Sequence, residues 1–107
     1  MSTRQFLTGW HSGDWPGGTY GLRFGALRES LVEPGSSYIK IQLEGESAFQ
    51  AALTGGFWKD CPEIRDPLIR DWMMKQKVSV PWPKGFPPRF PLECLGPNYF
   101  HVYYQTR

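Results

Sequence analysis

Four side chains in this sequence belong to the types that serve as nucleophile, general base or metal ligand, namely Cys61, Cys94, His11 and His101. A cysteine nucleophile needs a histidine within hydrogen-bond reach. Cys94 and His101 flank an expected turn and could approach one another, whereas Cys61, at an expected helix start, is the better-placed nucleophile. No pair has the complete set of partners or the short spacing of a preorganised zinc site. We therefore predict no catalytic residue, no metal site and no cofactor.

The two cysteines also bear on the location of the protein. No apolar segment of signal-peptide type follows Met1, and no apolar run approaches the length of a transmembrane helix. These features predict a cytoplasmic protein that does not enter a membrane. In a reducing compartment we expect both thiols to be unpaired, small, buried apolar groups.

Cations that alternate with aromatic residues provide the main functional signal. The net charge is only +2, but the stretch from residue 75 to residue 107 carries five cations against one acid. Lysine and arginine can hold phosphates while an aromatic ring stacks on an exposed base. The sequence therefore predicts a non-enzymatic domain that binds nucleic acid. The residues expected to contact phosphate are Arg23, Lys40, Lys84 and Arg89, and the expected stacking platform is Trp82 with Tyr99 or Tyr103.

A second class of function stays open beside nucleic-acid binding. The chain has five tryptophans, five tyrosines and ten prolines in 107 residues, more large aromatic rings than a core of this size needs. Tryptophan, tyrosine and arginine dominate the energetics of protein interfaces. The alternative is thus a protein–protein interaction module, such as an inhibitor, immunity or adaptor protein, that uses an exposed Trp/Tyr/Pro surface.

Hydrophobic patterning indicates the elements that would position these residues. Apolar and polar residues alternate as in half-buried strands. We expect strands within 19–25, 38–45 and 49–53, and a closing hairpin within 89–105. The segment 8–18, rich in glycine and tryptophan, is expected to be an arm or loop. The proline-rich segment 79–91 lies between folded elements, so we expect an ordered loop there.

One helix has clear boundary signals. Asp66 is a good N-cap, and Pro67 suits the first helical position because its missing N–H costs nothing there. We expect a helix at about 67–77 that packs Leu68, Ile69, Trp72 and Met73 on the strand at 38–45. Asp60 and Glu63 have the spacing of a capping box, which favours a short helical turn just before it.

The bulk properties place these elements in one unit. A chain of 107 residues fits a single domain with one core. The predicted fold class is α+β, a single small domain over 1–107, with a curved antiparallel sheet of about five strands covered by the helix. Strong curvature would make the sheet barrel-like.

Overall fold

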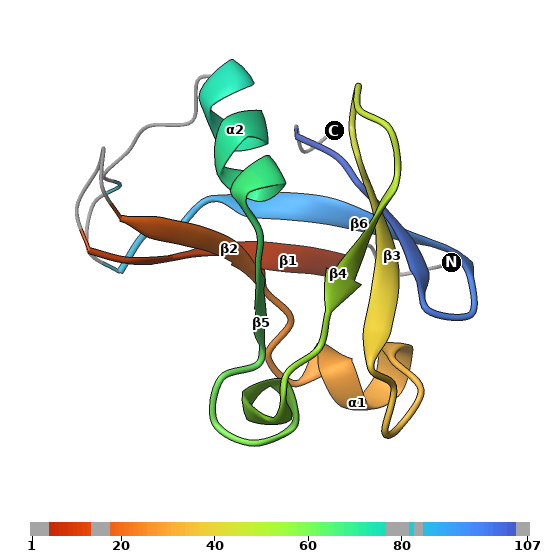
Figure 1. Cartoon of the computed structure of the whole chain (residues 1–107). Helices are drawn as coiled ribbons and strands as arrows, with labels where there is room; N and C mark the ends of the chain where they lie inside the picture. Colours follow the sequence, from red (N-terminus) through yellow and green to blue (C-terminus); the bar gives the residue numbers. More distant parts are fainter. Residues whose placement is uncertain (1–4, 14–17, 77–81, 83–84, 105–107) are drawn as a thin grey trace.

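The computed structural model describes residues 5–13, 18–76, 82 and 85–104. Two helices, α1 and α2, lie at opposite ends of a strongly curved sheet (Figure 1). The elements in chain order are β1 Gln5–Ser12, β2 Thr19–Arg23, α1 Leu27–Leu31, β3 Tyr38–Leu43, β4 Phe49–Ala52, a 3₁₀ turn Gly55–Trp58, β5 Glu63–Arg65, α2 Pro67–Lys75, β6 Arg89–Gly96 and β7 Tyr99–Val102.

The strands of the described chain form one sheet in the order β4-β3-β7-β6-β1-β2-β5. Neighbours pair antiparallel except β3 and β7, which are parallel. The two edge strands, β4 and β5, approach each other, so the sheet is nearly closed (Figure 1). The predicted single α+β domain with a barrel-like sheet is confirmed. The sheet has seven strands rather than about five, and it is mixed rather than wholly antiparallel because β3 and β7 run parallel.

The first additional strand is β1, which replaces much of the arm expected at 8–18. Residues 8–12 belong to this strand, and Leu7 is fully buried. The glycine at position 9 reflects a close contact rather than a turn. The N–H of Gly9 donates to the Pro88 carbonyl at 2.8 Å, and an added Cβ would lie 2.7 Å from the Pro88 ring. Glycine at this position therefore indicates the close approach of another segment and not a turn.

The second additional strand is β5, where the capping-box pattern predicted a helical turn. Glu63 does not cap a helix; its carboxylate Oε1 accepts a hydrogen bond from the Arg65 guanidinium at 2.8 Å. The segment pairs with β2 through Ile64 opposite Leu22, and both of these side chains are buried. Burial of the strand against β2 therefore overrides the local helical signal.

Helix α2 begins as predicted, with Pro67 in its first turn and the Asp66 carboxylate accepting from the Leu68 N–H at 2.9 Å. It ends at Lys75, short of the expected residue 77, which lies outside the described residues. Ile69, Trp72 and Met73 are buried, but α2 lies mainly against β2 rather than against the predicted strand at 38–45, which is β3. Leu68 is half exposed, so its predicted packing is wrong, because it precedes the stripe formed by positions 69, 72 and 73 and points away from it.

The N-cap gives a stability prediction. Asp66→Ala should lower the free energy of unfolding by about 1 kcal/mol, because the Leu68 N–H loses its partner. Asp66→Asn should leave stability nearly unchanged, since asparagine caps equally well. Chemical denaturation of the three proteins measures the difference. Equal stability of the alanine and asparagine variants would contradict a capping role.

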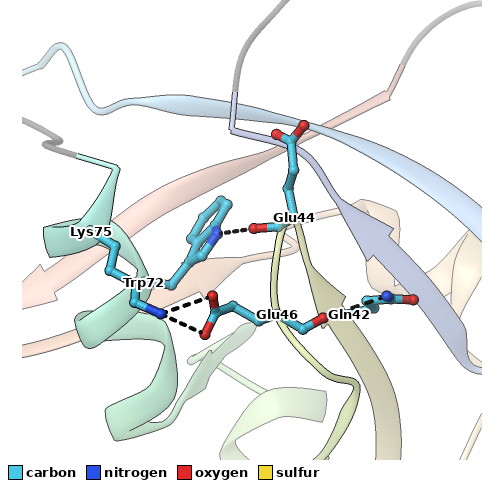
Figure 2. Close-up of polar contacts among 5 residues, drawn as sticks. All are labelled: Gln42, Glu44, Glu46, Trp72 and Lys75. Atoms are coloured by element: carbon cyan, nitrogen blue, oxygen red, sulfur yellow. Dashed lines mark hydrogen bonds and ion pairs between the residues drawn. The ribbon is translucent and has the colours of Figure 1, made fainter.

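The Trp72 indole ties α2 to the end of β3 (Figure 2). Its N–H donates to the Glu44 carbonyl at 2.9 Å, and its ring lies 5.2 Å from the Phe90 ring, centroid to centroid. One turn further along, Lys75 forms an ion pair with Glu46 at 3.0 Å. The helix is thus held over one end of the sheet by a buried aromatic contact and two polar contacts.

Candidate functional site

Two of the predicted phosphate-binding cations lie in one row across the sheet. Thr8 of β1 is opposite Arg23 of β2 on one side and opposite Arg89 of β6 on the other. Adjacent strands are about 4.8 Å apart, so the two arginine backbones are separated by about 10 Å. Their neighbours Leu7, Leu22 and Phe90 point into the core, so both arginines project from the outer face of the sheet and are exposed.

Two aromatic rings on the same outer face are covered by arginine. The Arg89 guanidinium lies 4.2 Å from the centre of the Phe6 ring, and that of Arg65 lies 4.3 Å from the centre of the Trp10 ring. Gly21 of β2 lies between Trp10 of β1 and Arg65 of β5. Because glycine has no side chain, nothing separates the indole from the guanidinium. We call the set formed by Phe6, Thr8, Trp10, Arg23, Arg65 and Arg89 the arginine face.

Arg65 is held in place by a buried carboxylate. The Glu63 side chain is 4% exposed and binds the Arg65 guanidinium at 2.8 Å. The hydrogen bond that Arg65 donates to the Glu63 carboxylate raises the pKa of Arg65 above its ordinary value; desolvation opposes this shift, while the charge of Glu63 and contacts with Cys61 support it. The guanidinium is therefore charged and oriented over the indole.

Lys40 and Tyr99 lie elsewhere on the outer face. The Lys40 ammonium is 4.7 Å from the centre of the Tyr99 ring, and Tyr99 is opposite Gly96 at the far end of β6 from Arg89. That separation is about 23 Å along the strand. The four cations predicted as one surface are therefore divided, with Arg23 and Arg89 together and Lys40 apart. Lys84 lies outside the described residues.

The predicted stacking residue Tyr103 follows β7 directly and belongs to a polar cluster with residues of β6 and β7. Its hydroxyl donates to the Glu93 carboxylate at 2.8 Å, and its ring stacks on His101 with centroids 4.2 Å apart. The Tyr99 hydroxyl similarly donates to the Gln42 side-chain oxygen at 3.3 Å. These tyrosines already bind groups of the sheet itself, which makes them poorer platforms for an unstacked base.

Trp82 lies on the opposite face of the sheet from these tyrosines. Its ring contacts His11 edge-to-face at 4.7 Å and lies 6.0 Å from the Tyr20 ring, on the core side of β1 and β2. The structure therefore does not bring Trp82 together with Tyr99 or Tyr103. In the proline-rich segment the structure describes residues 82 and 85–91. Phe86 there is 76% exposed, so its ring is not packed into the core.

The cysteine–histidine pair does not form a catalytic arrangement. Cys94 is opposite Phe100 in the hairpin and His101 is opposite Glu93, so the side chains of Cys94 and His101 project to opposite faces. Both thiols are free and exposed, and the expectation that they are buried is wrong. Cys94 lies beyond Leu92, where the described pairing of β6 with β1 ends.

The position of Cys61 also differs from the expected helix start, since it precedes β5. Among the residues that the structure describes, no group of three or more His, Cys, Asp or Glu side chains could hold a metal ion.

Sequence patterning missed Phe6, Trp10 and Arg65. Phe6 and Trp10 are on β1, partly interpreted as an arm, and Arg65 is on β5, interpreted as part of a helical turn. The available signal was the alternation of Phe6, Thr8 and Trp10 with Leu7 and Gly9. This alternation places the first three residues on one face of a strand.

No protein-family model, curated protein or solved structure matches this chain. Within the described ranges, neither helix is long and apolar enough to cross a membrane. The chemistry of the arginine face is therefore the basis for assigning a function.

Proposed function

We propose that the arginine face binds single-stranded nucleic acid. The observation that carries this proposal is the placement of Arg23, Arg65 and Arg89 beside Trp10 and Phe6 on one outer face. Arginine binds phosphate through its planar fork of N–H donors. The aromatic rings and the guanidinium planes offer surfaces on which bases can stack.

The charge balance of this surface supports an anionic ligand. Glu63 offsets the charge of Arg65. Neither Arg23 nor Arg89 forms an ion pair within the described part of the chain. Their charges, about 10 Å apart across Thr8, are thus available to a phosphate backbone.

The shape of the surface favours a single strand over a duplex. The major groove admits a projecting helix or a two-stranded ribbon, whereas the arginine face is the outside of a broad curved sheet built from β1, β2, β5 and β6. A sheet that carries half-buried rings capped by guanidinium planes suits unpaired bases, which can spread out and stack on these planes.

Fluorescence anisotropy with labelled single-stranded and duplex DNA and RNA, at about 50 and 200 mM salt, tests the proposal. We expect the single strands to bind at low salt and to bind much more weakly at high salt. Arg23→Gln with Arg89→Gln should weaken binding at least tenfold, since each contact with phosphate contributes about 1 kcal/mol or more. In the double variant, the slope of log affinity against log salt concentration should also become shallower, by the amount expected for the loss of about two phosphate contacts.

The matched control is Lys40→Gln with Lys59→Gln. It removes the same charge from β3 and from the residue that follows the 3₁₀ turn, away from the arginine face. Melting curves should show that both double variants are folded. Absence of binding to any nucleic acid at about 50 mM salt, or equal loss in both double variants, would contradict the proposal.

Exposed apolar side chains favour protein binding as the second candidate function. Leu68 and Met74 of α2 are 50% and 47% exposed, and Phe86 is 76% exposed. A role as an inhibitor, immunity or adaptor protein becomes the leading candidate if the anisotropy experiment detects no binding of nucleic acid. A cytoplasmic location stays a prediction in either case.

A further inference from the structure

A shallow pocket lies beside the arginine face. Its volume is about 170 Å³, and it lies where β2, the end of β5 and the start of α2 meet. The side chains that line it are those of Thr19, Tyr20, Arg65, Asp66, Pro67 and Arg70. This volume is below the usual range for sites of drug-sized ligands, about 300 Å³ and above, so it suits one small group.

The lining residues indicate the charge of that group. Among the described lining residues, two arginines and a threonine hydroxyl are strong hydrogen-bond donors, and one carboxylate, that of Asp66, opposes them. This carboxylate accepts the Leu68 N–H at the start of α2, where a helix dipole partly offsets its negative charge. The surplus of donors favours a small anion.

Arg65 connects the pocket with the arginine face. The same side chain lines the pocket and covers the Trp10 ring at 4.3 Å. Arg65 also lies two residues along β5 from Glu63, which is opposite Arg23. A strand that crosses the row of Arg89 and Arg23 therefore reaches the pocket at one of its ends.

We infer that this pocket holds the terminal phosphate of the bound single strand. The inference rests on the proposed function and specifies which oligonucleotides bind best. A terminal monoester phosphate carries a charge of about −1.5 to −2 at pH 7 and three strong acceptor oxygens. An internal phosphodiester has a single charge and one acceptor oxygen fewer, so a pocket lined by several N–H and O–H donors should prefer the terminal group.

The test compares oligonucleotides of about ten nucleotides that carry a 5′-phosphate, a 3′-phosphate or hydroxyls at both ends. We expect one of the two phosphorylated forms to bind about tenfold more tightly than the hydroxyl form. Thr19→Val and Arg70→Gln should each reduce this advantage several-fold. Lys59→Gln is the control for a cation outside the pocket. Melting curves establish which variants are folded.

Asp66→Asn makes the test sharper. Asparagine keeps the helix cap but removes the negative charge of Asp66, the one carboxylate among the described residues that line the pocket. The variant should therefore increase the advantage of the phosphorylated oligonucleotide. If the pocket instead read a base through its Asp66 carboxylate, the same variant would weaken binding of phosphorylated and hydroxyl oligonucleotides alike, and the inference would be overturned.

The outcomes separate this inference from the proposed function. Equal, salt-dependent binding of phosphorylated and hydroxyl oligonucleotides would overturn the terminal-phosphate site and leave the arginine face in place. A phosphate advantage that persists in both Thr19→Val and Arg70→Gln would also overturn it. If no oligonucleotide binds at all, both proposals fail. If Arg70→Gln does not fold, Thr19→Val and Asp66→Asn still decide the matter.

Discussion

Replacing Trp72 with alanine is expected to lower the free energy of unfolding by about 4 kcal/mol. The side chain is 1% exposed, and its ring packs against those of Phe90 and Tyr104. Truncation would leave a large cavity between α2 and the sheet and would also remove the donor to the Glu44 carbonyl. Urea denaturation followed by circular dichroism measures the change without depending on tryptophan fluorescence.

A second variant separates packing from hydrogen bonding. Trp72→Phe keeps most of the buried ring but loses the indole N–H, so it should lower the free energy of unfolding by only about 2 kcal/mol. A cost below about 1 kcal/mol for Trp72→Ala would mean that α2 is not packed on the sheet in this way.

Replacing Gly21 with alanine should have the next largest effect, a loss of about 3 kcal/mol in the free energy of unfolding. An added Cβ would lie 2.2 Å from the Ile64 carbonyl oxygen and 3.2 Å from its carbonyl carbon. Both atoms belong to the backbone of β5, so β5 must move away from β2. That movement would also separate Arg65 from Trp10, so under the proposed function the folded fraction should bind single-stranded nucleic acid more weakly.

Gly55→Ala is the matched control for this substitution. An added Cβ at Gly55 would meet no atom within 4 Å, so the free energy of unfolding should change by no more than about 0.5 kcal/mol. Urea denaturation of the two alanine variants measures the contrast. Similar stability of the two variants would show that β2 and β5 do not approach as closely as described.

Local signals in the sequence were sufficient for several elements. The Asp66–Pro67 pair predicted the start of α2, and the alternation of Ile39, Ile41 and Leu43 predicted β3. The closing hairpin was also confirmed, with Asn98 in its turn at a φ of 53°. Each of these signals involves residues that are close in sequence, so it can be recognised without knowledge of the tertiary fold.

The missed strands depend on contacts between distant segments. Glycine is needed at position 9 because Pro88 approaches closely there. The strand β5 has only three residues and is formed by its pairing with β2. The arginine face required both strands and the register across Gly21. Sequence patterning could therefore predict exposed Arg23 and Arg89, but not that Arg65 would join them over a tryptophan.

The central position of β7 has a consequence for the order of folding. This strand pairs with β3 on one side and with β6 on the other, although it is the last strand of the described chain to be synthesised. A nascent chain that lacks residues 99–102 has no partner for the exposed hydrogen-bonding edges of β3 and β6. Because the pairing of β3 with β7 also closes a long loop, we expect slow folding that leaves these edges open to chaperones or to aggregation until β7 is in place.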